Sequence, residues 1–291
     1  MNLTGIMVPL VTPFNDQNDV DLTKLGQLAE AFIQAGVSGL VVCGTTGEYY
    51  TFTEAEREAV LSTVAKVGKG RVSLIAGAND LSTAGAIKRA QQAKALGYDG
   101  LMLAAPAYSL PSQAGIIAHF EAVADSTDLP IVMYNFPARV GVNIEFETVV
   151  HLSGHKNIKG IKESSGDFSH ALSLIQAQLP DFEVVCGCDD QAADFFYWGV
   201  KGWISGAANV FPAEQVAMLA AANQGDWAEV RAKMQAMYPA IRSMECGDYN
   251  QKAKLGCRRH GVDAGSVRLP LVDMNREDSA AFVALLDQFD A

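Results

Sequence analysis

The sequence Gly160-Ile161-Lys162-Glu163-Ser164-Ser165 places a lysine directly after a short apolar run, 158–161. Such a run is typical of a buried strand, and the following Ser165-Gly166-Asp167 is typical of a helix start. A lysine at a strand end commonly points into water. At the mouth of an apolar barrel it would lose solvation, which favours the free amine, and a free amine can condense with a ketone to a Schiff base. The rest of the chain decides between these interpretations.

Short apolar runs recur along the chain at roughly thirty-residue spacing and alternate with amphipathic stretches. Continuous apolar runs are expected for strands buried on both faces of a parallel sheet. The predicted strands are 5–11, 38–43, 72–76, 100–104, 130–134, 158–162, 182–186 and 202–205. The helices predicted between them are 22–34, 53–67, 82–96, 113–124, 145–152, 168–178 and 191–198.

Local signals fix several of the helix ends. Asp21 is expected to cap the first helix and Gly36 to end it, and Thr53 with Glu56 forms a capping box. Strict strand–helix alternation predicts an α/β fold, a (β/α)8 TIM barrel. The alternative, a doubly wound open sheet, needs a glycine-rich phosphate loop after the first strand, and Val11-Thr12-Pro13-Phe14 is not one.

The last part of the chain contains helical patterns and no clear strand. These patterns cover about 213–224, 226–243, 248–260 and 277–289. No linker of biased composition separates them from the preceding residues. We therefore expect a barrel over 1–212 and a C-terminal helical extension over 213–291, packed on the barrel within the same domain.

Composition excludes several classes of protein. The 291 residues are 49% hydrophobic and carry a net charge of −11 without a basic run, which argues against nucleic-acid or anionic-membrane partners. The amino terminus lacks the pattern of a signal peptide, and no apolar run approaches the length of a membrane span. Five scattered cysteines form no disulfide framework, so we expect a cytoplasmic protein.

Three local pairs have simple interpretations. Cys186 and Cys188 lack the second pair or nearby histidine that a metal site would need. His151 and His155 lie four residues apart on a predicted outer helix without an adjacent carboxylate, which favours a surface pair over metal ligands. The pair 189–190, two aspartates, could be an acid/base pair, but its position at a helix start favours N-terminal caps.

Polar residues gather where the predicted strands end, which is where the βα loops of a barrel carry its chemistry. Each tyrosine among them could be a packed aromatic. Together with the lysine they suggest Schiff-base chemistry in which phenol and hydroxyl groups transfer protons. These residues are Thr45, Thr46, Tyr108, Tyr134, Asn135, Lys162, Gly187, Ser205 and Gly206.

The chain resembles the pyruvate-dependent class I aldolase family that contains dihydrodipicolinate synthase and N-acetylneuraminate lyase. The resemblance runs from Gly5 to about Pro212 and continues more loosely to the end. It rests on three motifs in order, with support from a fourth, Lys201-Gly202-Trp203-Ile204-Ser205. The three are Gly44-Thr45-Thr46-Gly47-Glu48, Tyr134-Asn135-Phe136-Pro137-Ala138-Arg139-Val140-Gly141 and Gly160-Ile161-Lys162-Glu163.

The resemblance implies roles for particular residues. Lys162 matches the lysine that forms the imine with pyruvate, and Tyr134 matches the phenol that relays protons beside it. Thr45 matches the hydroxyl that links this phenol to a second tyrosine, matched by Tyr108. In the family that tyrosine reaches across a dimer interface, so the resemblance implies a homodimer or homotetramer.

Other matches concern substrate binding. Thr46 matches the group that holds the pyruvate carboxylate, and Gly187 and Ile204 match positions whose backbone lines the pocket. Arg139 matches the arginine that faces the carboxylate of aspartate semialdehyde in the synthases, a suitable bidentate partner. A surface ion pair is the alternative for Arg139.

Some positions depart from the synthase pattern. Leu81, Gly85 and Ala107 replace the polar residues of lysine-inhibited synthases, which argues against that feedback. Tyr49-Tyr50 is expected to add bulk near the site mouth. The segment 248–252 (Asp-Tyr-Asn-Gln-Lys) stands where many synthases have an Asn-Pro segment.

The resemblance therefore implies a lyase that needs no metal or other cofactor and binds pyruvate covalently at Lys162. The expected reaction condenses pyruvate with aspartate semialdehyde to 4-hydroxy-tetrahydrodipicolinate, in lysine biosynthesis. An aldolase or dehydratase of 2-keto-3-deoxy sugar acids, using the same imine, is the first alternative. A non-catalytic barrel that serves as a binding protein is the second.

Overall fold

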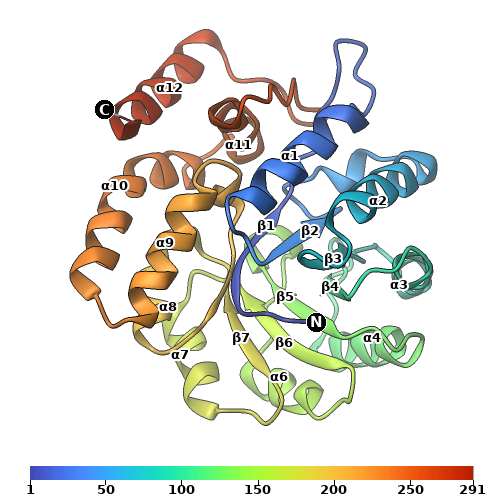
Figure 1. The fold of residues 1–291 in the computed structure, drawn as a ribbon. Helices are drawn as coiled ribbons and strands as arrows, with labels where there is room; N and C mark the ends of the chain where they lie inside the picture. The colour runs from blue at the N-terminus through green and yellow to red at the C-terminus, as the bar shows by residue number, and fades with distance from the viewer. Residues whose placement is uncertain (291) are drawn as a thin grey trace.

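The computed structural model describes residues 1–290 and confirms the (β/α)8 barrel. Each strand pairs in parallel with its neighbours in chain order, and β8 pairs with β1 to close the sheet (Figure 1). The strands are β1 Gly5–Pro9, β2 Gly39–Val42, β3 Ser73–Gly77, β4 Gly100–Ala104, β5 Ile131–Asn135, β6 Ile158–Glu163, β7 Glu183–Cys186 and β8 Gly202–Ile204.

Side chains that alternate along the strands fill the barrel interior and form one buried cluster. Opposite alternation directs the other strand side chains to the surrounding helices, where they join a second, larger cluster. The interior cluster contains Leu3, Met7, Val41, Ile75, Met102, Ala104, Val132, Tyr134, Val185 and Ile204. Lys162 faces this apolar interior because it is paired with Tyr134 across β5 and β6.

The helices that follow the strands surround the sheet (Figure 1). Asp21 caps the first of them by accepting from the Lys24 N–H, and Thr53 and Glu56 form the predicted capping box. Gly36 has the left-handed φ of +89° expected after a helix end. These helices are α1 Leu22–Gln34, α2 Glu54–Gly68, α3 Thr83–Ala95, α4 Gln113–Asp125, α5 Pro137–Val140, α6 Phe146–Ser153, α7 Phe168–Ala177 and α8 Ala192–Tyr197.

Four further helices, coloured orange to red in Figure 1, lie together at one side of the barrel. They are α9 Pro212–Asn223, α10 Trp227–Glu245, α11 Tyr249–Gly256 and α12 Arg276–Asp290. The predicted helix over 248–260 is shorter than expected, because residues 257–260 form a 3-10 turn after α11. Within residues 1–290, no helix has the length and apolar character needed to cross a bilayer.

The most informative difference from the sequence prediction is the end of β6. The prediction ended this strand at Lys162, but Glu163 continues it by pairing with Asn135 of β5 on one side and Cys186 of β7 on the other. The register shifts at the start of the β5–β6 pair, where Ile131 faces Ile158 but Val132 faces Gly160. Because of this bulge, Gly160 and Lys162 share the inward face with Val132 and Tyr134.

Candidate active site

Lys162 lies inside the barrel against an aromatic ring. Its side chain is buried, and Nζ is 4.3 Å from the centroid of the Tyr134 ring. The Tyr134 ring is itself tilted by 31° against Phe136, with 5.5 Å between the ring centroids. A lysine so placed is surrounded mainly by apolar and aromatic groups, as the Schiff-base interpretation requires.

The ionisation of both groups follows from this burial. Desolvation lowers the pKa of Lys162, and the negative charge of the Asp189 carboxylate acts in the opposite direction. Desolvation also raises the pKa of the Tyr134 phenol far above its ordinary value, so Tyr134 is a neutral hydroxyl that can donate a proton. The pair therefore offers a more available amine beside a neutral proton donor.

The loop after β2 brings two hydroxyl residues to the same place. Thr45 and Thr46 lie in a turn in which the Gly47 N–H donates to the Gly44 carbonyl and the Glu48 N–H donates to the Thr45 carbonyl. The Thr12 hydroxyl donates to the Gly47 carbonyl at 2.8 Å and holds the turn against the end of β1. The position of both threonines is therefore set by backbone contacts.

Gly187 follows β7, and only a glycine fits there. A Cβ atom at this position would lie 1.9 Å from Ser164 Oγ, 2.7 Å from the Glu163 carbonyl oxygen and 2.8 Å from Lys162 Cγ. The Gly187 N–H also donates to the Glu163 carbonyl at 2.9 Å. The close approach of the β7 backbone thus fixes the base of the Lys162 side chain.

Glu163 points away from the barrel interior and orders the loops on either side of Lys162. Its carboxylate accepts from Asn135 Nδ2 at 2.8 Å and from the Ser165 N–H at 2.6 Å. Asn135 Oδ1 in turn accepts from the Ile144 N–H. Glu163 and Asn135, which follow Lys162 and Tyr134 in their motifs, therefore fix the loops next to the site through hydrogen bonds outside the barrel interior.

A cavity of about 560 Å³ opens at the carboxyl ends of the strands, over Lys162. Seven of the residues predicted at the site line it: Thr45, Thr46, Tyr134, Arg139, Lys162, Gly187 and Gly206. Ile204 does not line it; its side chain is fully buried in the barrel interior, and the predicted backbone role stays a prediction. Tyr108 does not either, since it is 94% exposed in the loop after β4, with a left-handed φ of +68°.

Sequence reasoning was wrong about Asp189, which is buried and caps no helix. Its carboxylate accepts from Trp203 Nε1 at 3.0 Å, from the Ala207 N–H at 2.9 Å and from the Tyr249 hydroxyl. Tyr249 begins α11 and lines the cavity. The signal available for Asp189 was its place directly after a strand end, whereas nothing in the sequence pointed to Tyr249 as its partner.

The cavity mouth carries charges of both signs. Arg139 is exposed, with its guanidinium 5.8 Å from the Phe136 ring centroid, and Arg242 and Glu245 of α10 also line the cavity. Desolvation and the carboxylates at 189 and 190 raise the pKa of Glu245 to about 7. Neither Tyr49 nor Tyr50 lines the cavity, although Asn250 Nδ2 lies 3.4 Å from the Tyr50 hydroxyl at its edge.

Other candidate groups take no part in this cavity's polar network. His151 and His155 are paired with Glu121 and Asp125 of α4, so the expectation that they lack a carboxylate partner was wrong. Cys186 is a buried free thiol whose pKa is raised by desolvation. Within residues 1–290, no three His, Cys, Asp or Glu side chains are grouped to hold a metal ion.

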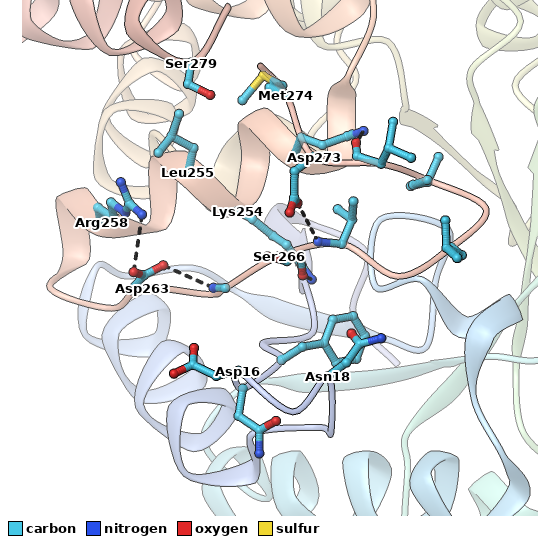
Figure 2. Close-up of a pocket in the computed structure, with 18 residues that line it drawn as sticks. Asp16, Asn18, Lys254, Leu255, Arg258, Asp263, Ser266, Asp273, Met274 and Ser279 are labelled. Carbon is cyan, nitrogen blue, oxygen red and sulfur yellow. Dashed lines mark hydrogen bonds and ion pairs between the residues drawn. The ribbon is translucent and has the colours of Figure 1, made fainter. Parts of the chain in front are cut away.

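A second cavity, of about 660 Å³, lies between the 14–18 segment and the C-terminal extension (Figure 2). Several of its polar side chains are already hydrogen-bonded to other groups of the protein. Asp263 accepts from Arg258 and from the Gly265 N–H, and Asp273 accepts from the Val267 N–H. Convergent catalytic groups are found in the cavity over Lys162, which we therefore take as the candidate active site.

Comparison with known proteins gives a consistent result. A sequence profile described as the Dihydrodipicolinate synthetase family matches residues 2–289. The chain is 42% identical to the 4-hydroxy-tetrahydrodipicolinate synthase of Exiguobacterium sibiricum, over 97% of this chain and 96% of that protein. It is 38% identical to the protein of the same name from Moorella thermoacetica, over 97% of each.

Solved structures agree with the sequence comparison. A dihydrodipicolinate synthase structure from Bacillus anthracis superposes with a TM-score of 0.95 at 34% identity, covering 99% of this chain and 98% of that one. The dihydrodipicolinate synthase structure from Aquifex aeolicus gives a TM-score of 0.94 at 32% identity, with coverage of 99% and 98%.

Proposed function

The chain belongs to the dihydrodipicolinate synthetase family, and we propose that it is a 4-hydroxy-tetrahydrodipicolinate synthase, a lyase that condenses pyruvate with aspartate semialdehyde. The observation that carries this proposal is the pairing of Lys162 with Tyr134 at the base of the cavity. The free cysteines suit a reducing compartment such as the cytoplasm.

Covalent chemistry begins at Lys162 in this proposal. The unprotonated amine attacks the C2 carbonyl of pyruvate, and loss of water from the carbinolamine gives the imine. Loss of a C3 proton gives an enamine, whose carbon attacks the aldehyde of the second substrate. Tyr134 supplies and removes protons, and Thr45 connects it to further proton donors. The imine serves as the electron sink, so these steps call for no resident metal.

The two carboxylates need separate partners. Thr46, on the same turn as Thr45, is suited to the pyruvate carboxylate, together with backbone N–H groups of that turn. Arg139 lies at the cavity mouth with no carboxylate partner among residues 1–290, so it is available for the carboxylate of aspartate semialdehyde. Gly187 lets the backbone after β7 pass close to the Lys162 side chain, and the Ile204 side chain packs in the barrel interior.

The position of Tyr108 supports an oligomeric enzyme. A tyrosine that is 94% exposed, at a loop tip with positive φ, is a costly arrangement for an isolated chain. We propose that Tyr108 enters the site of a second copy in a homodimer or homotetramer and extends the proton relay there. Leu81, at 69% exposure, and Ala107 offer few polar groups for a lysine effector.

An aldehyde panel at matched pyruvate concentration tests the choice of second substrate. We expect turnover with aspartate semialdehyde well above that with aldehydes derived from sugar acids. Arg139→Ala should reduce kcat/KM with aspartate semialdehyde more than with a neutral aldehyde, by about 2–5 kcal/mol if the ion pair is desolvated. Arg231→Ala, an exposed arginine of α10 that does not line the cavity, serves as the matched control. Turnover of sugar-acid aldehydes alone would replace this proposal with the 2-keto-3-deoxy acid reaction.

A further inference from the structure

The C-terminal extension places a lysine against a glutamate of the barrel in the protein interior. Lys254 of α11 is 2% exposed and Glu48 is 0% exposed, and Lys254 Nζ lies 2.8 Å from Glu48 Oε1. Nζ also donates to the Ser266 carbonyl at 2.6 Å and lies 3.9 Å from the centroid of the Phe14 ring. In Figure 2 the Lys254 side chain runs from α11 toward Ser266. The ammonium group is therefore held on several sides.

The second oxygen of Glu48 is also bound by the extension. Oε2 accepts from the Arg268 N–H at 2.9 Å. The Arg268 guanidinium donates in turn to the Asn18 and Thr51 carbonyls, and pairs with Glu56 at 2.6 Å. Glu48 itself has a left-handed φ of +57°, which is unfavourable for a residue with a side chain. The extension therefore maintains a backbone conformation that Glu48 would not adopt freely.

Glu48 also closes the turn that contains Thr45 and Thr46. Glu48 donates its N–H to the Thr45 carbonyl, so a shift of Glu48 moves Thr45 and Thr46 with it. Asn250, also on α11, donates to the same Thr45 carbonyl at 3.3 Å. Two residues of α11, Asn250 and Lys254, thus contact one five-residue stretch, 44–48, at the active site.

We propose that Glu48 and Lys254 are positioning residues, a buried ion pair that fixes the hydroxyl groups of Thr45 and Thr46 over Lys162. The proposal rests on the function proposed above, since it assigns the pair a role in pyruvate binding. A buried ion pair contributes little net stability compared with an apolar pair of the same size, but removing one partner leaves an unpaired charge. The pair thus defines one conformation of the turn.

A paired substitution separates positioning from stability. Glu48→Gln and Lys254→Met each leave a buried charge unpaired, and the double variant Glu48→Gln/Lys254→Met removes both charges while keeping side-chain size. Arg259→Met is the matched control, because Arg259 pairs with Glu214 and Asp290 in the same extension and does not contact the 44–48 turn. The measurements are the melting temperature and the pyruvate concentration that gives half-maximal borohydride trapping.

The double variant is expected to fold and to need at least about 10-fold more pyruvate for half-maximal trapping, with a lower kcat as well. Arg259→Met is expected to lower the melting temperature and leave the half-saturating concentration unchanged. A folded double variant with the wild-type value would overturn the proposal, and so would an equal increase in Arg259→Met. Failure of the wild-type protein to form any adduct would instead reject the proposed function.

Chemical rescue gives a second readout that a purely structural role would not move. Lys254 lines the 660 Å³ cavity, so Lys254→Ala opens space that a small molecule can enter from that side. Propylamine replaces the deleted atoms and restores the positive charge, whereas propanol restores volume alone. We expect propylamine to lower the pyruvate requirement of Lys254→Ala and to leave that of the wild type unchanged. Equal recovery with propanol would contradict a role for the charge.

Discussion

Tyr134 and Lys162 lie directly opposite each other on neighbouring parallel strands, with Nζ 4.3 Å from the ring centroid. This arrangement depends on the bulge near the start of β6, because a shift of one residue would turn the lysine out of the barrel. The sheet register therefore brings the amine and the phenol to the base of one cavity.

The first prediction concerns the Tyr134 hydroxyl. Tyr134→Phe should reduce kcat by about 100-fold or more, because carbinolamine formation and dehydration both require proton transfer. Tyr98→Phe is the matched control, since the Tyr98 hydroxyl is buried and donates to the Leu61 carbonyl away from the site. The control should lose about 1 kcal/mol of stability and keep its kcat. Steady-state kinetics and urea unfolding test both, and equal kcat values for the two variants would contradict the role of Tyr134.

The second prediction concerns the buried Asp189 carboxylate. Asp189→Asn should destabilise the fold by about 1–3 kcal/mol, because the amide cannot accept all three hydrogen bonds from Trp203, Ala207 and Tyr249. The neighbouring Asp190→Asn, at an exposed position, should change the free energy of unfolding by less than about 0.5 kcal/mol. Urea unfolding measures both values. A similar loss of unfolding free energy in the two variants would show that the hydrogen bonds of Asp189 do not stabilise the fold.

The third prediction is a pH dependence that originates at Glu245. Its pKa is raised to about 7 in the folded protein from an ordinary value of 4.5, by desolvation and by the negative charges of Asp189 and Asp190; Lys162 and Arg139 act in the opposite direction. Protonation of Glu245 therefore favours the folded state. This stabilisation is fully present below about pH 4.5 and is lost as the pH rises through about 7.

Glu245→Gln should remove that component, so its melting temperature should change less than that of the wild type between pH 5 and about 7.5. Thermal melts in matched buffers provide the measurement, with Glu229→Gln, on the same helix, as the control. Parallel curves for wild type and Glu245→Gln would rule out the raised pKa.

Periodicity and caps were sufficient to predict the barrel, because each strand is a continuous apolar run and each cap is a local signal. The sequence also predicted four of the site residues, because they lie at or just after the ends of predicted strands: Lys162, Tyr134, Thr45 and Thr46. Ile204 was predicted to line the pocket through its backbone; its side chain lies in the interior cluster, and the backbone role stays a prediction.

Long-range pairs could not be predicted. Tyr249 binds Asp189 from 60 residues away, and Asn250 binds the Thr45 carbonyl across a sequence separation of 205 residues. No local sequence pattern marks Tyr249 or Asn250 as a hydrogen-bonding partner, because these bonds form only when α11 packs on the barrel. Tyr108 is 94% exposed in the single chain. Its reach into a second copy was inferred from the resemblance alone and stays a prediction.

The central claim is that Lys162 forms an imine with pyruvate, and borohydride reduction in the presence of pyruvate tests it most directly. The account predicts one pyruvate-derived adduct per chain, located at Lys162 by peptide mass spectrometry and absent from Lys162→Ala. No adduct in the wild-type protein, or an adduct that persists in Lys162→Ala, would contradict the account.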